Sequence, residues 1–202
     1  MTKIKFCGIT RECDMAAANE INPEYVGFVF AKSSRRYVSA DTAAKLKKLL
    51  NPNILAVGVF VDENVENVAD LLNRDIIDIA QLHGSENEEY IARLRTLTKK
   101  PIIKAFRVKS EDEAEKAEKC SADFVLLDSG AGTGKAFDWS LIKNVKRPYL
   151  LAGGLGLGNI SEAVKMLSPY AVDVSSGIET DGKKDKTKMA AFARAVRKEE
   201  EI

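Results

Sequence analysis

The stretch Lys3-Ile4-Lys5-Phe6-Cys7-Gly8-Ile9-Thr10 begins with alternating polar and apolar side chains and then reaches a glycine. The alternation has the period of a β-strand, with Lys5 and Cys7 on the same face. Gly8 ends the strand, and the hydroxyl of Thr10 is placed to cap a following helix. In a parallel α/β fold, ligands bind at the carboxyl ends of such strands. Cys7 is therefore a candidate for chemistry, with a small buried cysteine as the alternative.

The same order of strand and helix recurs along the chain. Eight short apolar runs predict strands over Lys3–Cys7, Tyr25–Phe30, Ile54–Val61, Ile76–Leu82, Pro101–Phe106, Ala122–Asp128, Pro148–Ala152 and Ala171–Ser175. Segments with apolar residues at helical spacing predict helices over Arg11–Ile21, Ala40–Leu50, Val65–Leu72, Asn87–Leu97, Ser110–Lys119, Trp139–Val145, Ile160–Leu167 and Lys186–Lys198. Alternation of this kind indicates right-handed βαβ units and a parallel sheet.

Eight such units in 202 residues predict the α/β fold known as the (β/α)8 or TIM barrel, a closed sheet of eight parallel strands. An open, doubly wound sheet is the alternative, but it more often has five or six strands and a glycine-rich fingerprint after the first. No linker or change in composition divides the chain. We therefore expect one barrel domain over residues 1–202.

Composition narrows the classes of function. The chain has 31 basic and 30 acidic residues and a formal net charge of +1, which argues against a nucleic-acid partner. No apolar run approaches the roughly 18 residues that span a bilayer, so we expect a cytoplasmic protein without membrane contact. Three cysteines without CxxC spacing and one histidine predict neither a disulfide framework nor a metal site. We expect a monomer or a homodimer.

A basic loop, Ala31-Lys32-Ser33-Ser34-Arg35-Arg36-Tyr37, follows the second predicted strand. A planar guanidinium group can hold a carboxylate with two parallel hydrogen bonds. Either Arg35 or Arg36 is thus a candidate for contact with an anionic ligand, and a solvated loop is the alternative.

Two further strands end in polar side chains. The fourth ends in Gln81-Leu82-His83-Gly84, which places Gln81 and His83 on one face, although a lone histidine is more often structural than catalytic. The sixth ends in Asp128, which is either a loop cap or a functional carboxylate. The glycine-rich segment 129–135 then follows, without the spacing of a P-loop. We expect it to form a flap over a ligand.

Small residues follow the seventh and eighth strands. Gly153 and Gly154 follow the seventh, and Ser175, Ser176 and Gly177 follow the eighth. Small residues let backbone N–H groups approach an anion, and the loops after strands 7 and 8 commonly bind phosphate in barrel enzymes. These loops predict a site for a phosphorylated small molecule, with tight turns as the alternative.

Together these segments resemble the phosphoribosylanthranilate isomerase family of tryptophan biosynthesis. The matching motifs occur in family order at residues 5–10, 27–30, 34–37, 81–84, 126–129, 132–135, 151–155 and 173–179. The resemblance implies a metal-free and cofactor-free Amadori rearrangement of N-(5'-phosphoribosyl)anthranilate to 1-(o-carboxyphenylamino)-1-deoxyribulose 5-phosphate.

The resemblance also implies roles for single residues. Cys7 matches the general base of the family, Asp128 its general acid, and Arg36 the arginine that faces the anthranilate carboxylate. Arg35 stands where the family pattern has proline, which leaves open which arginine contacts the ligand. The remaining matches are to substrate-binding and phosphate-binding positions: Gln81, His83, Asp173, Gly153, Gly154, Ser175, Ser176 and Gly177.

This chemistry requires a thiolate and a carboxylic acid, the reverse of the forms that the reference pKa values favour at neutral pH. We expect Lys5, on the same strand face, to lower the pKa of Cys7, and burial beside Phe124 and Leu126 to raise that of Asp128. Two alternatives remain open. One is a barrel isomerase of histidine biosynthesis, which has an aspartate base in place of Cys7, and the other is a noncatalytic binder of a phosphorylated metabolite.

Overall fold

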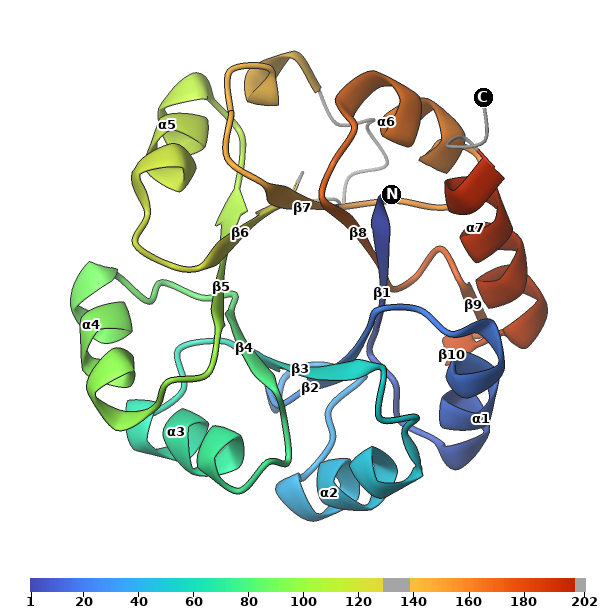
Figure 1. The fold of residues 1–202 in the computed structure, drawn as a ribbon, viewed down its shortest axis with the longest axis horizontal. Coiled ribbons are helices and arrows are strands. Elements are labelled where there is room, and N and C mark those ends of the chain that lie inside the picture. The colour runs from blue at the N-terminus through green and yellow to red at the C-terminus, as the bar shows by residue number, and fades with distance from the viewer. Residues whose placement is uncertain (129–138, 199–202) are drawn as a thin grey trace.

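Eight parallel strands form a closed barrel in the computed structural model, which describes residues 1–128 and 139–198 (Figure 1). Each strand pairs with its neighbours in chain order, and β1 pairs with β8 in a register that sets Lys5 beside Asp173. The strands are β1 (Lys3–Cys7), β2 (Tyr25–Val29), β3 (Leu55–Phe60), β4 (Ile79–Leu82), β5 (Ile102–Arg107), β6 (Phe124–Asp128), β7 (Tyr149–Ala152) and β8 (Ala171–Val174). The predicted TIM barrel is confirmed.

Helices surround the barrel (Figure 1). They are α1 (Glu12–Ile21), α2 (Ala40–Leu49), α3 (Val65–Asn73), α4 (Glu88–Leu97), α5 (Glu111–Lys119), α6 (Ile160–Leu167) and α7 (Lys186–Lys198). The helix predicted over Trp139–Val145 is wrong, because the structure has only a short 3-10 helix at Trp139–Ile142. Its apolar residues Trp139, Leu141, Ile142 and Val145 still pack on the core, so spacing that looks helical here reflects burial rather than an α-helix.

The start of α1 also differs from the prediction. Thr10 does not cap this helix, since the helix begins at Glu12 and its N-cap is Arg11. The buried carboxylate of Asp14 instead accepts hydrogen bonds from the backbone N–H groups of Thr10, at 3.3 Å, and Arg11, at 3.1 Å. A carboxylate at the third position of the helix thus reaches back to the backbone N–H groups just before the helix, as the acidic residue of a capping box does.

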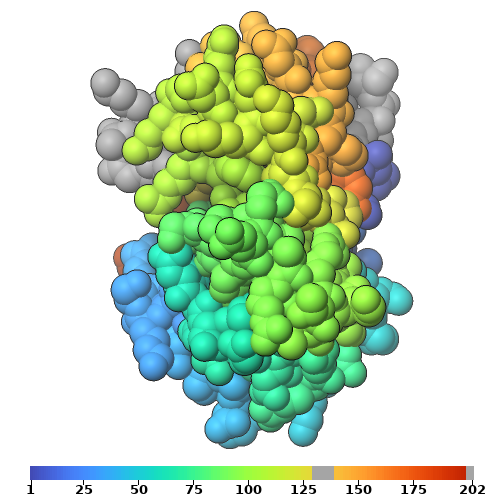
Figure 2. All heavy atoms as spheres, turned by 90° about the vertical axis from the view of Figure 1, so that its left-hand side faces the viewer, coloured from blue at the N-terminus to red at the C-terminus, as the bar shows by residue number. Residues whose placement is uncertain are grey.

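Two apolar clusters make up the core. The larger lies between the strands and the helices and includes Phe6, Phe28, Leu72 and Phe192. The smaller fills the barrel interior with alternate residues of the strands, such as Ile103 and Leu126, as expected for a packed TIM-barrel core. On the side of α4 and α5, helical side chains cover the sheet (Figure 2).

A short antiparallel hairpin follows β8. It consists of β9 (Glu179–Thr180) and β10 (Lys183–Lys184), joined by Asp181 and Gly182, which both have positive φ. The strand and helix periodicity did not predict it. The flap expected over 129–135 lies outside the described residues. In the described part of the chain, no helix is long and apolar enough to cross a membrane.

Candidate active site

A cavity of about 380 Å³ opens at the carboxyl ends of the strands. Ten of the eleven side chains or glycines predicted for the site line it: Cys7, Arg36, Gln81, His83, Asp128, Gly153, Gly154, Asp173, Ser175 and Ser176. They come from β1, β4, β6 and β8 and from the loops after β2, β4, β7 and β8. The barrel thus brings together residues that are spread over most of the chain, as the strand-end argument predicts.

Cys7 ends β1 at the wall of this cavity. Burial raises the pKa of the Cys7 thiol, the carboxylate of Asp173 raises it further, and the ammonium groups of Lys5 and Lys184 oppose the rise. The expectation that the barrel lowers this pKa is therefore wrong in its net direction. Lys5 does favour the thiolate, but Lys5 is completely buried and forms a 2.8 Å ion pair with Asp173, which offsets its charge.

A chain of three side chains connects Gln81 with Asp128. Nε2 of Gln81 lies 3.0 Å from Nδ1 of His83, and Nε2 of His83 lies 3.3 Å from Oδ2 of Asp128. A neutral imidazole donates at one nitrogen and accepts at the other, and an amide that rotates by half a turn exchanges its donor and acceptor. The chain can therefore orient Asp128 either as a carboxylate or as a carboxylic acid.

Two buried oxygens at the cavity have no hydrogen-bond partner among the described residues. They are Oε1 of Gln81, whose residue is 1% exposed, and Oδ1 of Asp173, whose residue is 9% exposed. Buried polar atoms in native proteins are nearly always paired, so an unpaired acceptor at a cavity is open to a water molecule or a ligand that donates a hydrogen bond. Both atoms are acceptors, so they suit a ligand that carries hydroxyl groups.

The two arginines of the basic loop lie differently. Arg36 lines the cavity and its side chain is 20% exposed, whereas the side chain of Arg35 is 60% exposed and does not line the cavity. Both guanidinium groups contact the carboxylate of Glu179. The placement favours Arg36 over Arg35 for contact with a ligand in the cavity.

The loops after β7 and β8 pack tightly against each other. Gly153 and Gly154 have φ values of 92° and 65°, in the left-handed region that favours glycine. Gly177 does not line the cavity, but it forms a bridge with Gly156, and a Cβ at Gly177 would lie 2.0 Å from the carbonyl oxygen of Leu155. Gly177 therefore permits the close approach of the two loops, and any contribution of it to anion binding acts through the backbone.

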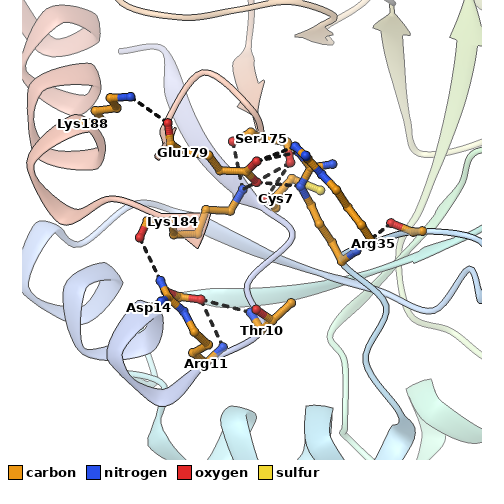
Figure 3. A network of polar contacts seen from close by, with 11 residues as sticks. Cys7, Thr10, Arg11, Asp14, Arg35, Ser175, Glu179, Lys184 and Lys188 are labelled. Carbon is orange, nitrogen blue, oxygen red and sulfur yellow. Dashed lines mark hydrogen bonds and ion pairs between the residues drawn. The ribbon is translucent and has the colours of Figure 1, made fainter. Parts of the chain in front are cut away.

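Sequence reasoning missed a polar cluster beside the cavity, formed by Glu179 and Lys184 of the hairpin. Nζ of Lys184 donates to Oε1 of Glu179 at 2.7 Å and to the carbonyl of Ser175 at 2.9 Å (Figure 3). The sequence does carry a signal for the hairpin, because Asp181-Gly182 is a typical two-residue β-turn. The two-residue strands are too short to show a period.

Among residues 1–128 and 139–198, no group of three or more His, Cys, Asp or Glu side chains is arranged to hold a metal ion. The described residues that line the cavity include the thiol of Cys7, the guanidinium of Arg36 and two carboxylates, Asp128 beside His83 and Asp173 paired with Lys5. Cys7 ends β1 and Asp128 ends β6, and these strands lie on different sides of the barrel (Figure 1). A substrate between them can exchange protons with both.

Known proteins are similar to this chain in sequence and in fold. The family model of N-(5'-phosphoribosyl)anthranilate isomerase matches residues 4–195. The N-(5'-phosphoribosyl)anthranilate isomerase of Endomicrobium trichonymphae is 45% identical, over 98% of this chain and 99% of that protein.

Solved structures agree with these sequence matches. A structure of generated monomers of the dimeric phosphoribosylanthranilate isomerase from Thermotoga maritima has a TM-score of 0.87 and 36% identity, over 98% of this chain and all of that one. A phosphoribosyl anthranilate isomerase in complex with reduced 1-(o-carboxyphenylamino)-1-deoxyribulose 5-phosphate has a TM-score of 0.86 and 35% identity, with the same coverage. The chain belongs to the N-(5'-phosphoribosyl)anthranilate isomerase family.

Proposed function

We propose that this chain catalyses the Amadori rearrangement of N-(5'-phosphoribosyl)anthranilate to 1-(o-carboxyphenylamino)-1-deoxyribulose 5-phosphate, a step of tryptophan biosynthesis, with Asp128 as general acid and Cys7 as general base. The observation that carries the proposal is the shared cavity, where a thiol and a carboxylate approach from different strands beside two buried acceptors that lack a partner. Membership of the isomerase family supports the reaction class.

Asp128 acts first in this proposal. Its carboxylic acid gives a proton to the furanose ring oxygen while the bond from that oxygen to C1' breaks, and the lone pair of the anthranilate nitrogen forms an iminium ion. His83, 3.3 Å from Asp128, keeps the carboxyl group oriented through the change of protonation state. The positive iminium makes the proton on C2' acidic.

Cys7 then removes the C2' proton. The electrons of the C–H bond form a C1'–C2' double bond and neutralise the iminium nitrogen. The resulting enol becomes the ketone when C1' takes up a proton and the C2' hydroxyl gives up its proton to solvent. C1' is reduced and C2' is oxidised within one molecule, so electrons balance without a further reactant. Because burial raises the pKa of Cys7, the thiolate is a minor form at neutral pH, and Lys5 and Lys184 stabilise it.

The remaining cavity residues bind the substrate in this proposal. Arg36 pairs with the anthranilate carboxylate, and the loops that contain Gly153, Gly154 and Ser175–Gly177 hold the phosphate. Gln81 and Asp173 accept hydrogen bonds from sugar hydroxyls, which would satisfy their unpaired oxygens. His83 contacts the substrate beside Asp128.

The proposal extends to the whole protein. We place residues 1–202 in a single barrel domain, because β1, the first barrel strand in the chain, pairs with β8, the last, and so closes the barrel. Three cysteines without a disulfide pattern suit the reducing cytoplasm. We propose a monomer or a homodimer, which sedimentation equilibrium would distinguish.

The test is turnover by the purified chain. Mixing it with N-(5'-phosphoribosyl)anthranilate should quench the anthranilate-type fluorescence as product forms. Asp128→Asn should lower kcat by about 10²- to 10⁴-fold, because an amide cannot deliver the proton. Binding of the reduced product without any turnover by the wild-type chain would instead identify a noncatalytic binder, and turnover of only the histidine-pathway aminoaldose would identify the other barrel isomerase.

A further inference from the structure

Glu179 holds one edge of the Arg36 guanidinium group. Nε of Arg36 donates to Oε1 of Glu179 at 2.6 Å, and Nη2 donates to Oε2 at 2.8 Å. This is a two-bond contact along the Nε–Nη2 edge, the geometry that fixes both the position and the plane of a guanidinium. The long and flexible side chain of Arg36 is thereby restricted to one orientation.

Arg36 also lines the cavity, and its contact with Glu179 uses only one edge of the guanidinium group. A guanidinium has five N–H donors, so two carboxylates can bind it at once, one on each edge. Glu179 takes the Nε–Nη2 edge, which leaves the donors of Nη1 and the second donor of Nη2 for a ligand in the cavity that Arg36 lines.

Gly8 makes room for this arrangement. Gly8 has a φ of 81°, and a Cβ there would lie 2.3 Å from Cδ of Arg36. The stem of the arginine therefore lies directly on the backbone turn after β1, next to Cys7. Contact with Gly8 on one side and with Glu179 on the other determines where the guanidinium group lies.

Glu179 is itself held in place. Its side chain is 4% exposed, and besides Arg36 it accepts from Lys184 Nζ at 2.7 Å and from Arg35 Nη2 at 2.8 Å (Figure 3). Nζ of Lys188 also donates to its backbone carbonyl at 2.7 Å. Although burial opposes ionisation, the hydrogen bonds from Arg36 and Lys184 lower the pKa of Glu179 to about 2. The carboxylate is charged throughout the neutral range.

The charges around Glu179 do not cancel. Three cations, Arg35, Arg36 and Lys184, surround one carboxylate, so the cluster keeps a net positive charge beside the cavity. Glu179 thus orients Arg36 without neutralising the attraction of the cluster for an anion. A cluster without Glu179 would have more positive charge but no fixed direction for the Arg36 donors.

We propose that Glu179 is a positioning residue for substrate recognition. Glu179 holds Arg36 so that the free edge of the guanidinium group receives the aromatic carboxylate of the substrate. The chain therefore depends on Glu179 to distinguish a ligand with this carboxylate from one without it. The inference rests on the proposed function, which supplies the anthranilate carboxylate. It assigns Glu179 an effect that a purely structural salt bridge would not have.

The test compares two ligands in binding, so that it does not depend on turnover. One is reduced 1-(o-carboxyphenylamino)-1-deoxyribulose 5-phosphate, and the other is its phenylamino counterpart, which lacks the carboxylate. Isothermal titration calorimetry gives both dissociation constants for the wild-type chain and for Glu179→Gln. We expect Glu179→Gln to weaken the carboxylate ligand by about 10- to 100-fold, the range for a charge-assisted contact, and the phenylamino ligand by less than about threefold.

A double-mutant cycle tests whether Glu179 acts through Arg36. In an Arg36→Met background, Glu179→Gln should leave the ratio of the two dissociation constants unchanged, because no guanidinium remains to be oriented. Glu86→Gln is a matched control, since Glu86 is another buried carboxylate at the barrel mouth and pairs with Lys104 at 3.0 Å. It should lower stability and leave the ratio at the wild-type value.

Glu179→Asp is the second variant in case Glu179→Gln does not fold, as judged by circular dichroism. Aspartate keeps the charge but is one methylene too short for the two-bond contact. The preference for the carboxylate ligand, measured as the dissociation constant of the phenylamino ligand divided by that of the carboxylate ligand, should therefore fall as in Glu179→Gln. A folded Glu179 variant that keeps the wild-type ratio, or one that weakens both ligands equally, would overturn the positioning role. If the wild-type chain showed no turnover, the proposed function would be overturned, but the binding result for Glu179 would stand.

Discussion

Lys5 is a completely buried cation inside the barrel, beside the proposed catalytic thiol. Burial alone would lower the pKa of Lys5, but the charge of Asp173 and the hydrogen bond to it, together with the contact with Cys7, outweigh burial and raise the pKa, so the ammonium group stays charged. For Cys7 the balance is the opposite, because burial and Asp173 outweigh the two lysines. One group of neighbouring charges thus stabilises the lysine cation and leaves the cysteine as a thiol.

The variant Lys5→Met should raise the pKa of Cys7. Removing the ammonium group removes a contribution that favours the thiolate, and an opposite charge nearby is worth roughly 1–3 pKa units. The rate of alkylation of Cys7 by iodoacetamide, followed against pH by peptide mass spectrometry, reports this pKa in the free protein. Asp173→Asn is the control of opposite sign, because it removes a charge that raises the pKa. An unchanged profile in Lys5→Met would leave Lys5 a purely structural residue.

Cys7→Ser should lower kcat by about 10²- to 10⁴-fold, the usual contribution of a general base. A hydroxyl is far harder to deprotonate than a thiol, while its similar size leaves the cavity open. Steady-state kinetics and titration with the reduced product should therefore show lost turnover and nearly unchanged binding. Substantial turnover by Cys7→Ser would remove Cys7 from the mechanism.

At the scale of elements, the contact between the loops after β7 and β8 depends on Gly177. Gly177→Ala should raise KM for the phosphorylated substrate by about tenfold or more, since the added Cβ would lie 2.0 Å from the Leu155 carbonyl and force the loops apart. A change in KM with kcat nearly constant is expected when a contact is shared by the ground and transition states.

Gly158→Ala is the matched control for this loop pair. Gly158 lies in the same loop after β7, but a Cβ there would meet nothing within 4 Å. It should keep the wild-type KM. If Gly177→Ala raised KM equally for a dephosphorylated substrate, the loops would be structural and the phosphate site would lie elsewhere.

At the scale of the whole molecule, Glu179 connects segments that are far apart in sequence. It bonds Arg35 and Arg36 from the loop after β2, and Lys184 and Lys188 from the hairpin and α7. The hairpin therefore attaches the C-terminal part of the chain to the N-terminal part of the barrel. Because these bonds need the carboxylate, the connection depends on pH.

Glu179 should make the free energy of unfolding depend on pH in the acid range. Its pKa is lowered from 4.5 to about 2 in the folded state, so the ionised form stabilises the fold above about pH 4.5, and this stabilisation is lost as pH falls toward 2. The lowered pKa corresponds to roughly 3 kcal/mol. Urea unfolding between pH 2 and pH 5 should show a smaller pH dependence in Glu179→Gln than in the wild-type chain. Equal slopes would contradict the role of Glu179 in this connection.

Much of the site follows from local sequence patterns. The period of two in residues 3–7, followed by a glycine, correctly placed Cys7 at the end of a strand, and Asp128 was placed in the same way. In a parallel barrel all such ends meet at one rim, so a local pattern together with a closed topology is sufficient to bring these residues together. The small residues after β7 and β8 line the same cavity, and their binding of phosphate stays a prediction.

The tertiary structure decided the interactions that depend on distance through space and on burial. Glu179 and Arg36 are separated by 143 positions, and no periodic pattern relates them. The net direction of the Cys7 pKa depends on how closely Asp173, Lys5 and Lys184 surround it, which strand parity alone does not determine. Side-chain alternation specifies which face of a strand a residue occupies, whereas electrostatic and hydrogen-bond energies change over a few ångströms. The sequence by itself therefore determined the barrel and its rim. Only the folded chain determined how the rim residues pair.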